Sequence, residues 1–194
     1  MTSDERQQAI CDSAITEFGR LGFYGSTTAA IAHGAGCSEP MIYKHFHDKK
    51  HLLRAALARS EQLAEADIDA ALDAEDPLAG WLAYIEHGDL TRYHRMICMR
   101  MLCATFPDGS DLQEHLRAGN ERLLGRFSRA LQRIDTREHE RRAELDPDQL
   151  GWLWLGVTLA GAYGAAIDSP DRFRQTLQTG GRVLTLVLSP KGAT

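Results

Sequence analysis

The sequence predicts an all-α protein of eight to ten helices. Apolar residues recur at helical spacing along nearly all of the 194 residues, and no stretch alternates apolar and polar residues as a half-buried strand does. Three helix starts share one pattern, a capping side chain followed by proline at the first helical position: Asp76-Pro77, Asp146-Pro147 and Ser169-Pro170. A chain of this length buries enough surface to fold without a disulfide or a metal ion.

The first expected helix carries an apolar stripe at Ile10, Ala14, Phe18 and Leu21, and it ends at Gly22 and Gly25. A long helix follows from about residue 48, with leucines at helical spacing on its inward face. Capping signals and apolar spacing then predict helices over residues 77–105, 110–142, 147–167 and 170–188.

Charge is distributed unevenly along the chain, whose net charge is −5. Residues 1–60 hold seven Lys/Arg and six Asp/Glu, a net charge of +1, whereas residues 61–194 hold fifteen and twenty-one, a net charge of −6. Within residues 26–60 the balance is five basic residues to two acidic ones. A small basic patch on an acidic chain is typical of a protein that meets a polyanion at one end.

Cysteine usage and the N-terminal sequence predict a cytoplasmic protein. Cys11, Cys37, Cys98 and Cys103 are widely spread without a C-x-x-C pair, and no apolar signal segment precedes them. Residues 150–167 contain no charge, but they reach only the lower limit of a membrane span and include four glycines. We therefore expect a helix that is buried on all sides, and no membrane partner.

Residues 27–46 have the pattern of two short helices joined by a tight turn. Thr27 can cap the first helix, and Ala32 is small enough for the two helices to cross closely. Gly36 suits a turn position with positive φ, while Ser38 and Pro40 mark the start of the second helix. This pattern predicts a helix-turn-helix, whose second helix enters the major groove of DNA.

The stretch from Ile10 to Leu53 resembles the N-terminal domain of TetR-type transcriptional regulators. The matching residues are Phe18, Gly22, Thr27-Thr28, Ile31-Ala32, Ala35-Gly36, Ser38, Ile42-Tyr43, His45-Phe46, Lys49 and Leu52-Leu53. The resemblance implies a helix-turn-helix DNA-binding domain over residues 1–48 and a helical-bundle regulatory domain for ligand binding and dimerisation over residues 49–194. It also implies a homodimeric repressor that a small, largely apolar effector releases from a pseudo-palindromic operator in double-stranded DNA.

Position in the motif and side-chain chemistry together select the expected DNA contacts. These are Thr27, Thr28, Ser38, Glu39, Pro40, Met41, Tyr43, Lys44, His45 and Lys49. The resemblance places Thr28, Tyr43, His45 and Lys49 on phosphates. Glu39, Pro40, Met41 and Lys44 are the candidates for base edges, because lysine suits guanine and a carboxylate suits the amino group of cytosine. Ala29 departs from relatives that read guanine with an arginine, which leaves base contacts from the first helix in doubt.

Dimers of this type need a large apolar face, and the two C-terminal helices offer one. The expected interface comprises Trp152, Leu155, Leu159, Tyr163, Phe173, Leu177, Gly180, Gly181, Leu184 and Val187. In particular, the glycine pair would let the backbone of a partner approach closely. The alternative is that both helices belong to the core of a monomer.

An effector pocket is expected among the middle helices. Its candidate lining is Trp81, Tyr84, Ile85, Tyr93, His94, Ile97, Met101, Phe106, Phe127 and Trp154. The same residues suit an ordinary helix core, and His94 with Cys98 also allows a soft-metal or thiol sensor. The alternative function is therefore a DNA-binding regulator whose helical body dimerises or binds proteins and has no small-molecule effector.

Motifs of common enzyme classes do not occur in the chain. It lacks G-x-S-x-G, G-x-G-x-x-G, a P-loop and H-E-x-x-H, and no glutamate is followed by histidine three residues later. We expect a protein that is not an enzyme, with no catalytic residue, no bound metal and no cofactor.

Overall fold

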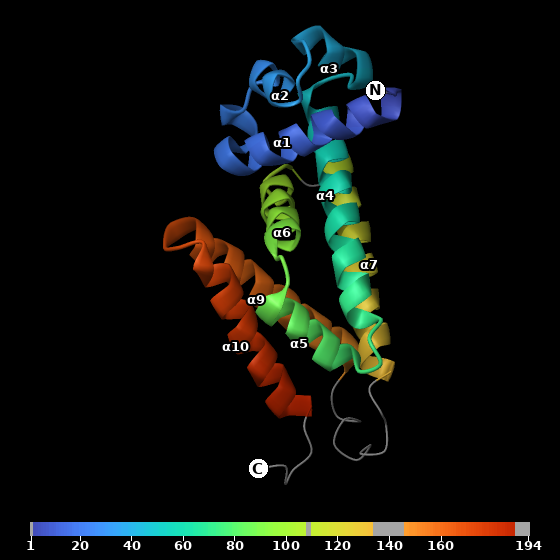
Figure 1. Cartoon of the computed structure of the whole chain (residues 1–194), viewed down its shortest axis with the longest axis vertical. Helices are drawn as coiled ribbons and strands as arrows, with labels where there is room; N and C mark the ends of the chain where they lie inside the picture. Colours follow the sequence, from blue (N-terminus) through green and yellow to red (C-terminus); the bar gives the residue numbers. More distant parts are fainter. Residues whose placement is uncertain (1, 108–109, 134–145, 189–194) are drawn as a thin grey trace. The chain divides into compact units, whose positions relative to one another are not determined.

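The structure is a computed structural model that describes residues 2–107, 110–133 and 146–188 (Figure 1). Within these residues nine helices form and no strand does, so the predicted all-α class is confirmed. The helices are α1 (Ser3–Gly25), α2 (Thr28–Gly34), α3 (Glu39–His45), α4 (Lys49–Leu72), α5 (Pro77–His87), α6 (Thr91–Ala104), α7 (Asp111–Arg133), α9 (Pro147–Ile167) and α10 (Asp171–Leu188).

Contacts divide the chain into two compact units, each of which is described by itself. The first unit comprises residues 1–64 and 95–116, and the second comprises residues 65–94 and 117–194. Helices α4, α6 and α7 therefore each contribute to both units. These units group residues by contact, and the functional boundary expected after residue 48 remains a prediction.

Helix α1 buries the predicted stripe as far as Phe18, whereas its last member, Leu21, is 42 % exposed. Ile10 and Phe18 are at most 1 % exposed. The helix begins with a capping box, because the Thr2 hydroxyl accepts from the Glu5 amide at 3.2 Å and the Glu5 carboxylate accepts from the Thr2 amide at 2.7 Å. Gly22 kinks the last turn with a φ of 68°, a conformation that favours glycine.

The core of the first unit joins α1 to α2, α3, α4 and parts of α6 and α7. Its further members include Ile31, Ala32, Ile42, Phe46, Leu52, Leu53, Leu57, Met99, Cys103, Leu112 and Leu116. Burial raises the pKa of the thiols of Cys11 and Cys103 to about 12, so both stay protonated at neutral pH. These two cysteines are packing residues of the core.

A buried ionic cluster connects three helices inside the first unit. The Arg100 guanidinium on α6 donates to Glu61 Oε1 on α4, and it also donates to the Leu116 carbonyl on α7 at 3.1 Å. Glu61 Oε2 lies 2.8 Å from His115 Nε2. The side chains of Glu61 and Arg100 are only 3 % and 7 % exposed, so their charges depend on each other.

The single helix predicted over residues 77–105 is wrong, because two helices form there. Asp76 caps α5 as expected, with its carboxylate accepting from the Leu78 amide at 2.9 Å. Gly88 ends α5 in an extended conformation, and the Asp89 carboxylate accepts from the Thr91 amide at 2.9 Å to begin α6. Of the helix expected over residues 110–142, Asp111–Arg133 is confirmed, and the remaining positions lie outside the described residues.

Arg174 on α10 hydrogen-bonds to the C-terminal end of α5 inside the second unit. Its guanidinium donates to the carbonyls of Ile85, Glu86 and Gly88 at 2.5, 3.0 and 2.7 Å. These carbonyls lie at the C-terminal end of α5, where helical hydrogen bonding leaves acceptors without partners and a cation is favoured. The sequence did not identify this contact, because the residues it joins lie almost ninety positions apart.

Candidate DNA-binding site and regulatory surfaces

The helix-turn-helix forms as predicted between Thr27 and Phe46. The Thr27 hydroxyl caps α2 by accepting from the Ala30 amide at 3.1 Å. Gly36 has a φ of 61°, and the turn is closed by the amide of Cys37, which donates to the Ala32 carbonyl at 2.9 Å. The short turn packs α2 against α3.

Helix α3 presents two distinct faces. Ile42 is 1 % exposed and Phe46, which ends the helix, is fully buried, so these two residues anchor the helix in the core. Pro40, Tyr43 and Lys44 are exposed. These three side chains are accessible to a DNA duplex that approaches α3.

The remaining predicted contacts of α3 differ in how they are held. Met41 and His45 are half-buried, whereas Ser38 is exposed. Ser38 precedes α3 at the capping position, but its hydroxyl makes no capping hydrogen bond, contrary to what its place before Pro40 predicts. That hydroxyl is not required by the helix it precedes.

A hydrogen bond joins Thr28 on α2 to Glu39 on α3. The Thr28 side chain is only 8 % exposed, and its hydroxyl donates to Glu39 Oε1. The Tyr43 hydroxyl lies 3.2 Å from the same threonine oxygen. Two residues expected on phosphates and one expected on a base therefore form a single polar network in the chain itself.

Lys49, which we expect to contact a phosphate, is engaged within the first unit. Its ammonium group donates to the carbonyls of Phe23 and Ser26, the latter at 2.5 Å, and lies 4.7 Å from the centre of the Phe23 ring. Desolvation lowers the pKa of Lys49. The residue thus holds the α1–α2 connection to the start of α4, and its phosphate contact remains a prediction.

Most of the expected pocket residues form an aromatic cluster inside the second unit. The Trp81 ring lies 5.1 to 5.7 Å from those of Tyr84, Tyr93, Phe127 and Trp154, measured between ring centres. Ile85 is also buried there, and the centre of the His94 ring lies 4.6 Å from that of Phe173, a residue expected at the dimer interface, with the two rings tilted by 39°. Ile97, Met101 and Phe106 belong instead to the first unit, where Phe106 packs on Phe23.

Two polar groups in this cluster have no partner among the described residues. The indole nitrogens of Trp81 and Trp154 are buried and make no hydrogen bond. Trp81 and Trp154 are 2 % and 5 % exposed, and the centres of their rings are 5.7 Å apart. A buried donor without an acceptor costs about 1–3 kcal/mol, so an acceptor placed beside either indole would be bound favourably.

The residues assigned to the dimer interface divide into exposed and buried sets. Trp152, Leu159 and Tyr163 on α9 are 54, 38 and 60 % exposed. Leu155, Phe173 and Leu177 are buried within the second unit, so they belong to its core and not to its surface. Leu184 is half-buried, and the side chain of Val187 lies outside the described residues.

The close approach expected at Gly180 and Gly181 occurs within the chain. A Cβ atom at Gly180 would lie 2.6 Å from Val157 Cγ1, and one at Gly181 would lie 2.7 Å from Leu82 Cδ2. These glycines therefore allow α10 to pack on α9 and α5, which corrects their expected role toward a partner backbone.

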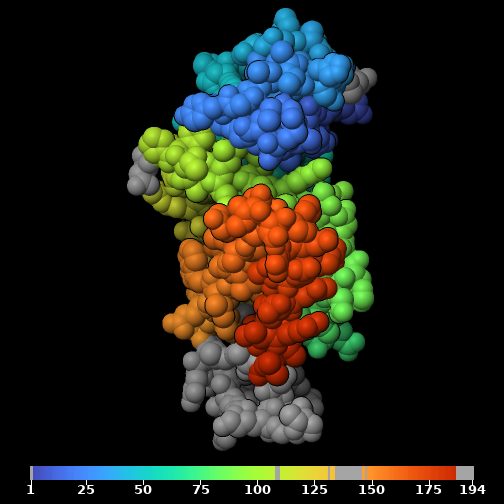
Figure 2. Space-filling view, turned by 90° about the vertical axis from the view of Figure 1, so that its left-hand side faces the viewer, coloured from blue at the N-terminus to red at the C-terminus, as the bar shows by residue number. Residues whose placement is uncertain are grey.

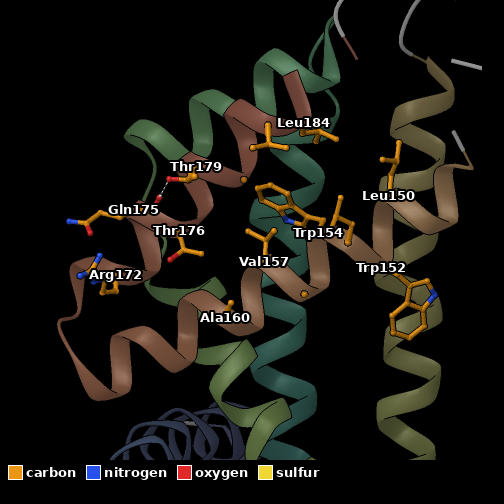
Figure 3. Close-up of a pocket in the computed structure, with 14 residues that line it drawn as sticks. Leu150, Trp152, Trp154, Val157, Ala160, Arg172, Gln175, Thr176, Thr179 and Leu184 are labelled. Carbon is orange, nitrogen blue, oxygen red and sulfur yellow. Dashed lines mark hydrogen bonds between the residues drawn. The ribbon is translucent and has the colours of Figure 1, made fainter. Parts of the chain in front are cut away.

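A groove of about 800 Å³ runs between α9 and α10 on the same surface (Figure 3). The surfaces of α9 and α10, orange and red in Figure 2, lie side by side and open to the outside. The sequence prediction contained four residues of the groove, Trp152, Trp154, Gly180 and Leu184. The apolar faces that helical spacing predicts also contain Leu150, Leu153, Val157 and Val183. The prediction missed Gly156, Ala160, Arg172, Gln175, Thr176 and Thr179, which are small or polar, and apolar spacing alone does not select such residues.

Helix α9 is long and apolar enough to span a membrane. Helices in the cores of other proteins also satisfy these two criteria. Only 33 % of its apolar window is buried inside the chain. The sequence predicts that one face of this helix packs on its own core and the other on a partner, and the burial of the second face stays a prediction. The soft-metal or thiol sensor that His94 and Cys98 allow stays an alternative. The described residues contain no group of three or more histidines, cysteines, aspartates or glutamates that could hold a metal ion.

Comparisons with known proteins agree with this geometry. Residues 10–56 match the family model of the bacterial regulatory proteins of the TetR family. The transcriptional regulator BetI of Brucella anthropi is 26 % identical over 188 residues, which cover 86 % of this chain and 85 % of that protein. The regulator RutR of Escherichia coli is 29 % identical over 102 residues, covering 50 % of this chain and 48 % of RutR.

Solved structures share the fold along nearly the whole chain. SmeT, the repressor of the Stenotrophomonas maltophilia multidrug efflux pump SmeDEF, has a TM-score of 0.70 at 20 % identity, with 97 % of this chain and 92 % of SmeT covered. A TetR-family regulator from Agrobacterium tumefaciens has a TM-score of 0.74 at 19 % identity, with 97 % and 100 % covered. The helix-turn-helix geometry, the match of residues 10–56 to the TetR-family model and the similar regulators together indicate a DNA-binding transcriptional regulator whose N-terminal domain is of the TetR type.

Proposed function

We propose that this chain is a cytoplasmic homodimeric repressor that binds a pseudo-palindromic operator and leaves it when a small, largely apolar effector binds its helical body. Its role is that of a binding protein rather than an enzyme. The observation that carries the proposal is α3, which anchors Ile42 in the core and leaves Tyr43 and Lys44 exposed. In a two-fold dimer, two such helices reach successive major grooves about one helical turn apart or slightly more.

Replacing Lys44 by alanine tests the reading of bases. An exposed lysine on α3 suits the O6 and N7 acceptors of guanine, so Lys44→Ala should reduce discrimination at one base position per half-site by about 1–3 kcal/mol. Affinities for the operator and its single-base variants measure this loss. Lys50→Ala is the matched control, because Lys50 pairs with Asp111 at 2.9 Å and should not alter base preference. An equal loss of affinity for every sequence would contradict the role of Lys44.

The dimer is supported by the apolar surface of α9. Trp152, Leu153 and Tyr163 are 54, 58 and 60 % exposed in the single chain, and large exposed apolar patches mark interaction sites. A second copy is the occupant proposed here, with α9 and α10 of each protomer packed as four helices. Such an interface also covers the apolar helix without a membrane.

The effector part of the proposal is supported by the aromatic cluster around Trp81. Aromatic and apolar side chains with a few polar groups are typical of small-molecule sites. SmeT, whose complex with triclosan has a TM-score of 0.66 at 21 % identity, is a similar protein that binds a small molecule. The indole donors of Trp81 and Trp154 favour an apolar effector that carries a hydrogen-bond acceptor.

Paired aromatic compounds that differ in one acceptor test the effector. Fluorene and 9-fluorenone have nearly the same shape, and only the ketone can accept from an indole. We expect the ketone to raise the unfolding temperature more and to release operator DNA, and at 100 times its Kd the stabilisation is about 2.7 kcal/mol. Trp81→Phe retains an aromatic ring without the donor and should reduce the difference between the two compounds.

A second candidate function is favoured by the packing of this cluster. Trp81 already contacts Tyr93 and Trp154 and is 2 % exposed, as expected for a core rather than a pocket. A DNA-binding regulator whose body only dimerises or binds proteins would have such a core. If no member of an apolar aromatic panel stabilises the protein or releases DNA, this second function is favoured.

A further inference from the structure

Three polar side chains of α2 and α3 form one hydrogen-bond chain that ends on a negative charge. The Thr28 hydroxyl donates to Glu39 Oε1, and its oxygen lies 3.2 Å from the Tyr43 hydroxyl. A hydroxyl has a single proton, and that of Thr28 goes to the carboxylate, so Tyr43 is the donor to Thr28. Both hydroxyl protons are therefore directed along the chain toward Glu39.

These two hydroxyls are the groups expected to donate to DNA phosphates. A proton donated to the carboxylate cannot be donated to a phosphate at the same time, so contact with DNA requires the network to open. We propose that Glu39 acts as an internal substitute for a phosphate, which occupies the Thr28 and Tyr43 hydroxyls and weakens binding to DNA of arbitrary sequence. This inference rests on the proposed DNA-binding function and assigns Glu39 a role in its specificity.

The charge of Glu39 adds repulsion to this competition. Thr28 is only 8 % exposed and hydrogen-bonded to the carboxylate, so a phosphate that reaches its hydroxyl comes close to a like charge. This repulsion is present at every DNA sequence, since every duplex carries the same phosphates.

The operator can offset this cost where other DNA cannot. Once displaced from Thr28, the Glu39 carboxylate can accept from the amino group of a cytosine, whereas a guanine or a thymine at the same position offers it only acceptors. Glu39 therefore raises the ratio of specific to nonspecific affinity by penalising the wrong sequences. In this role its carboxylate is used both in the absence of DNA and at the operator.

Glu39→Gln tests the inference, because glutamine has nearly the same shape and keeps an acceptor for Thr28, while it removes the charge and exchanges one carboxylate oxygen for an amide NH2 group. The probe is a random-sequence duplex long enough for one dimer, with Kd measured at several salt concentrations. The variant should bind this duplex about three- to tenfold more tightly than the wild type. The plot of log affinity against log salt should become steeper by about two, because one repelling charge is removed from each protomer of the dimer.

Two further variants separate this role from a general charge effect. Glu17→Gln removes the same charge from α1, where Glu17 pairs with Arg20 at 3.0 Å, and should bind the random duplex like the wild type. Thr28→Val removes the donor and leaves the carboxylate, so its nonspecific affinity should fall. Unfolding temperatures show that each variant is folded.

The possible results distinguish a failure of the Glu39 role from a failure of the proposed DNA-binding function. Nonspecific affinity that is unchanged or lower in Glu39→Gln, or that rises equally in Glu17→Gln, overturns the role of Glu39 and leaves DNA binding intact. If the wild type and all variants bind neither random nor selected duplexes, both the proposed function and this inference are overturned.

Discussion

Arg100→Met is expected to lower the free energy of unfolding by about 3–5 kcal/mol, because it removes the arginine that pairs with the buried Glu61 carboxylate. Glu61 and Arg100 are 3 % and 7 % exposed, so water cannot replace the lost contact. The substitution also removes the donor to the Leu116 carbonyl at 3.1 Å. Chemical denaturation followed by circular dichroism measures the change.

Two control variants make this prediction specific to the buried pair. Arg92→Met on the same helix breaks an ion pair with Asp67 at 3.2 Å, in which the arginine is 52 % exposed, and it should cost no more than about 1 kcal/mol. The double variant Glu61→Met with Arg100→Met should recover part of the stability, since it leaves no isolated charge. Equal effects of Arg92→Met and Arg100→Met would show that the cluster is not buried as described.

Leu159→Arg is expected to separate the proposed dimer and to reduce operator affinity by about 10²–10⁴-fold. Leu159 is 38 % exposed on α9, where an added charge must be buried against the second copy. Without the dimer, each helix-turn-helix binds a half-site alone and loses the high effective concentration of its linked neighbour. Analytical ultracentrifugation and DNA-binding titrations measure the two effects on one preparation.

Ala83→Arg adds the same charge to an exposed position of α5 and serves as the matched control. It should leave both the oligomeric state and the operator affinity unchanged. A Leu159→Arg variant that stays dimeric would place the interface elsewhere. One that becomes monomeric but retains full operator affinity would remove dimerisation from the mechanism.

Local features of the fold could be predicted from the sequence because they depend on neighbouring residues. The caps at Asp76 and Asp146 and the turn at Gly36 form where their side chains and backbone preferences require them. The break between α5 and α6 was also encoded locally, in Gly88 and Asp89, but apolar spacing on both sides of it suggested one continuous helix.

The sequence predicted which residues belong to the candidate site, but it did not predict the hydrogen bonds that these residues make to one another. Chemistry suggested that Glu39 meets a base and Lys49 a phosphate. The structure shows what each side chain does within the chain: Glu39 accepts from Thr28, and Lys49 donates to carbonyls of the α1–α2 connection. Such contacts join residues 11 to 26 positions apart and depend on how the helices cross, which helical periodicity does not specify.

The groove on α9 and α10 shows a second limit. The exposed apolar residues of α9 could be recognised by their spacing, whereas Arg172, Thr176 and Thr179 have no apolar signal. Figure 3 shows that these polar side chains come from α10 and face the same open space as Val157 of α9. Only the packing of the two helices brings them together.

Selection of genomic DNA fragments by the purified protein tests the central claim most directly. We expect one recurring palindromic site, which the wild type binds well above competitor DNA and whose base discrimination Lys44→Ala reduces. The affinity for that site at several salt concentrations separates phosphate contacts from base contacts. Uniformly weak and steeply salt-dependent binding to all fragments would contradict the assignment of α3 as a sequence-reading helix.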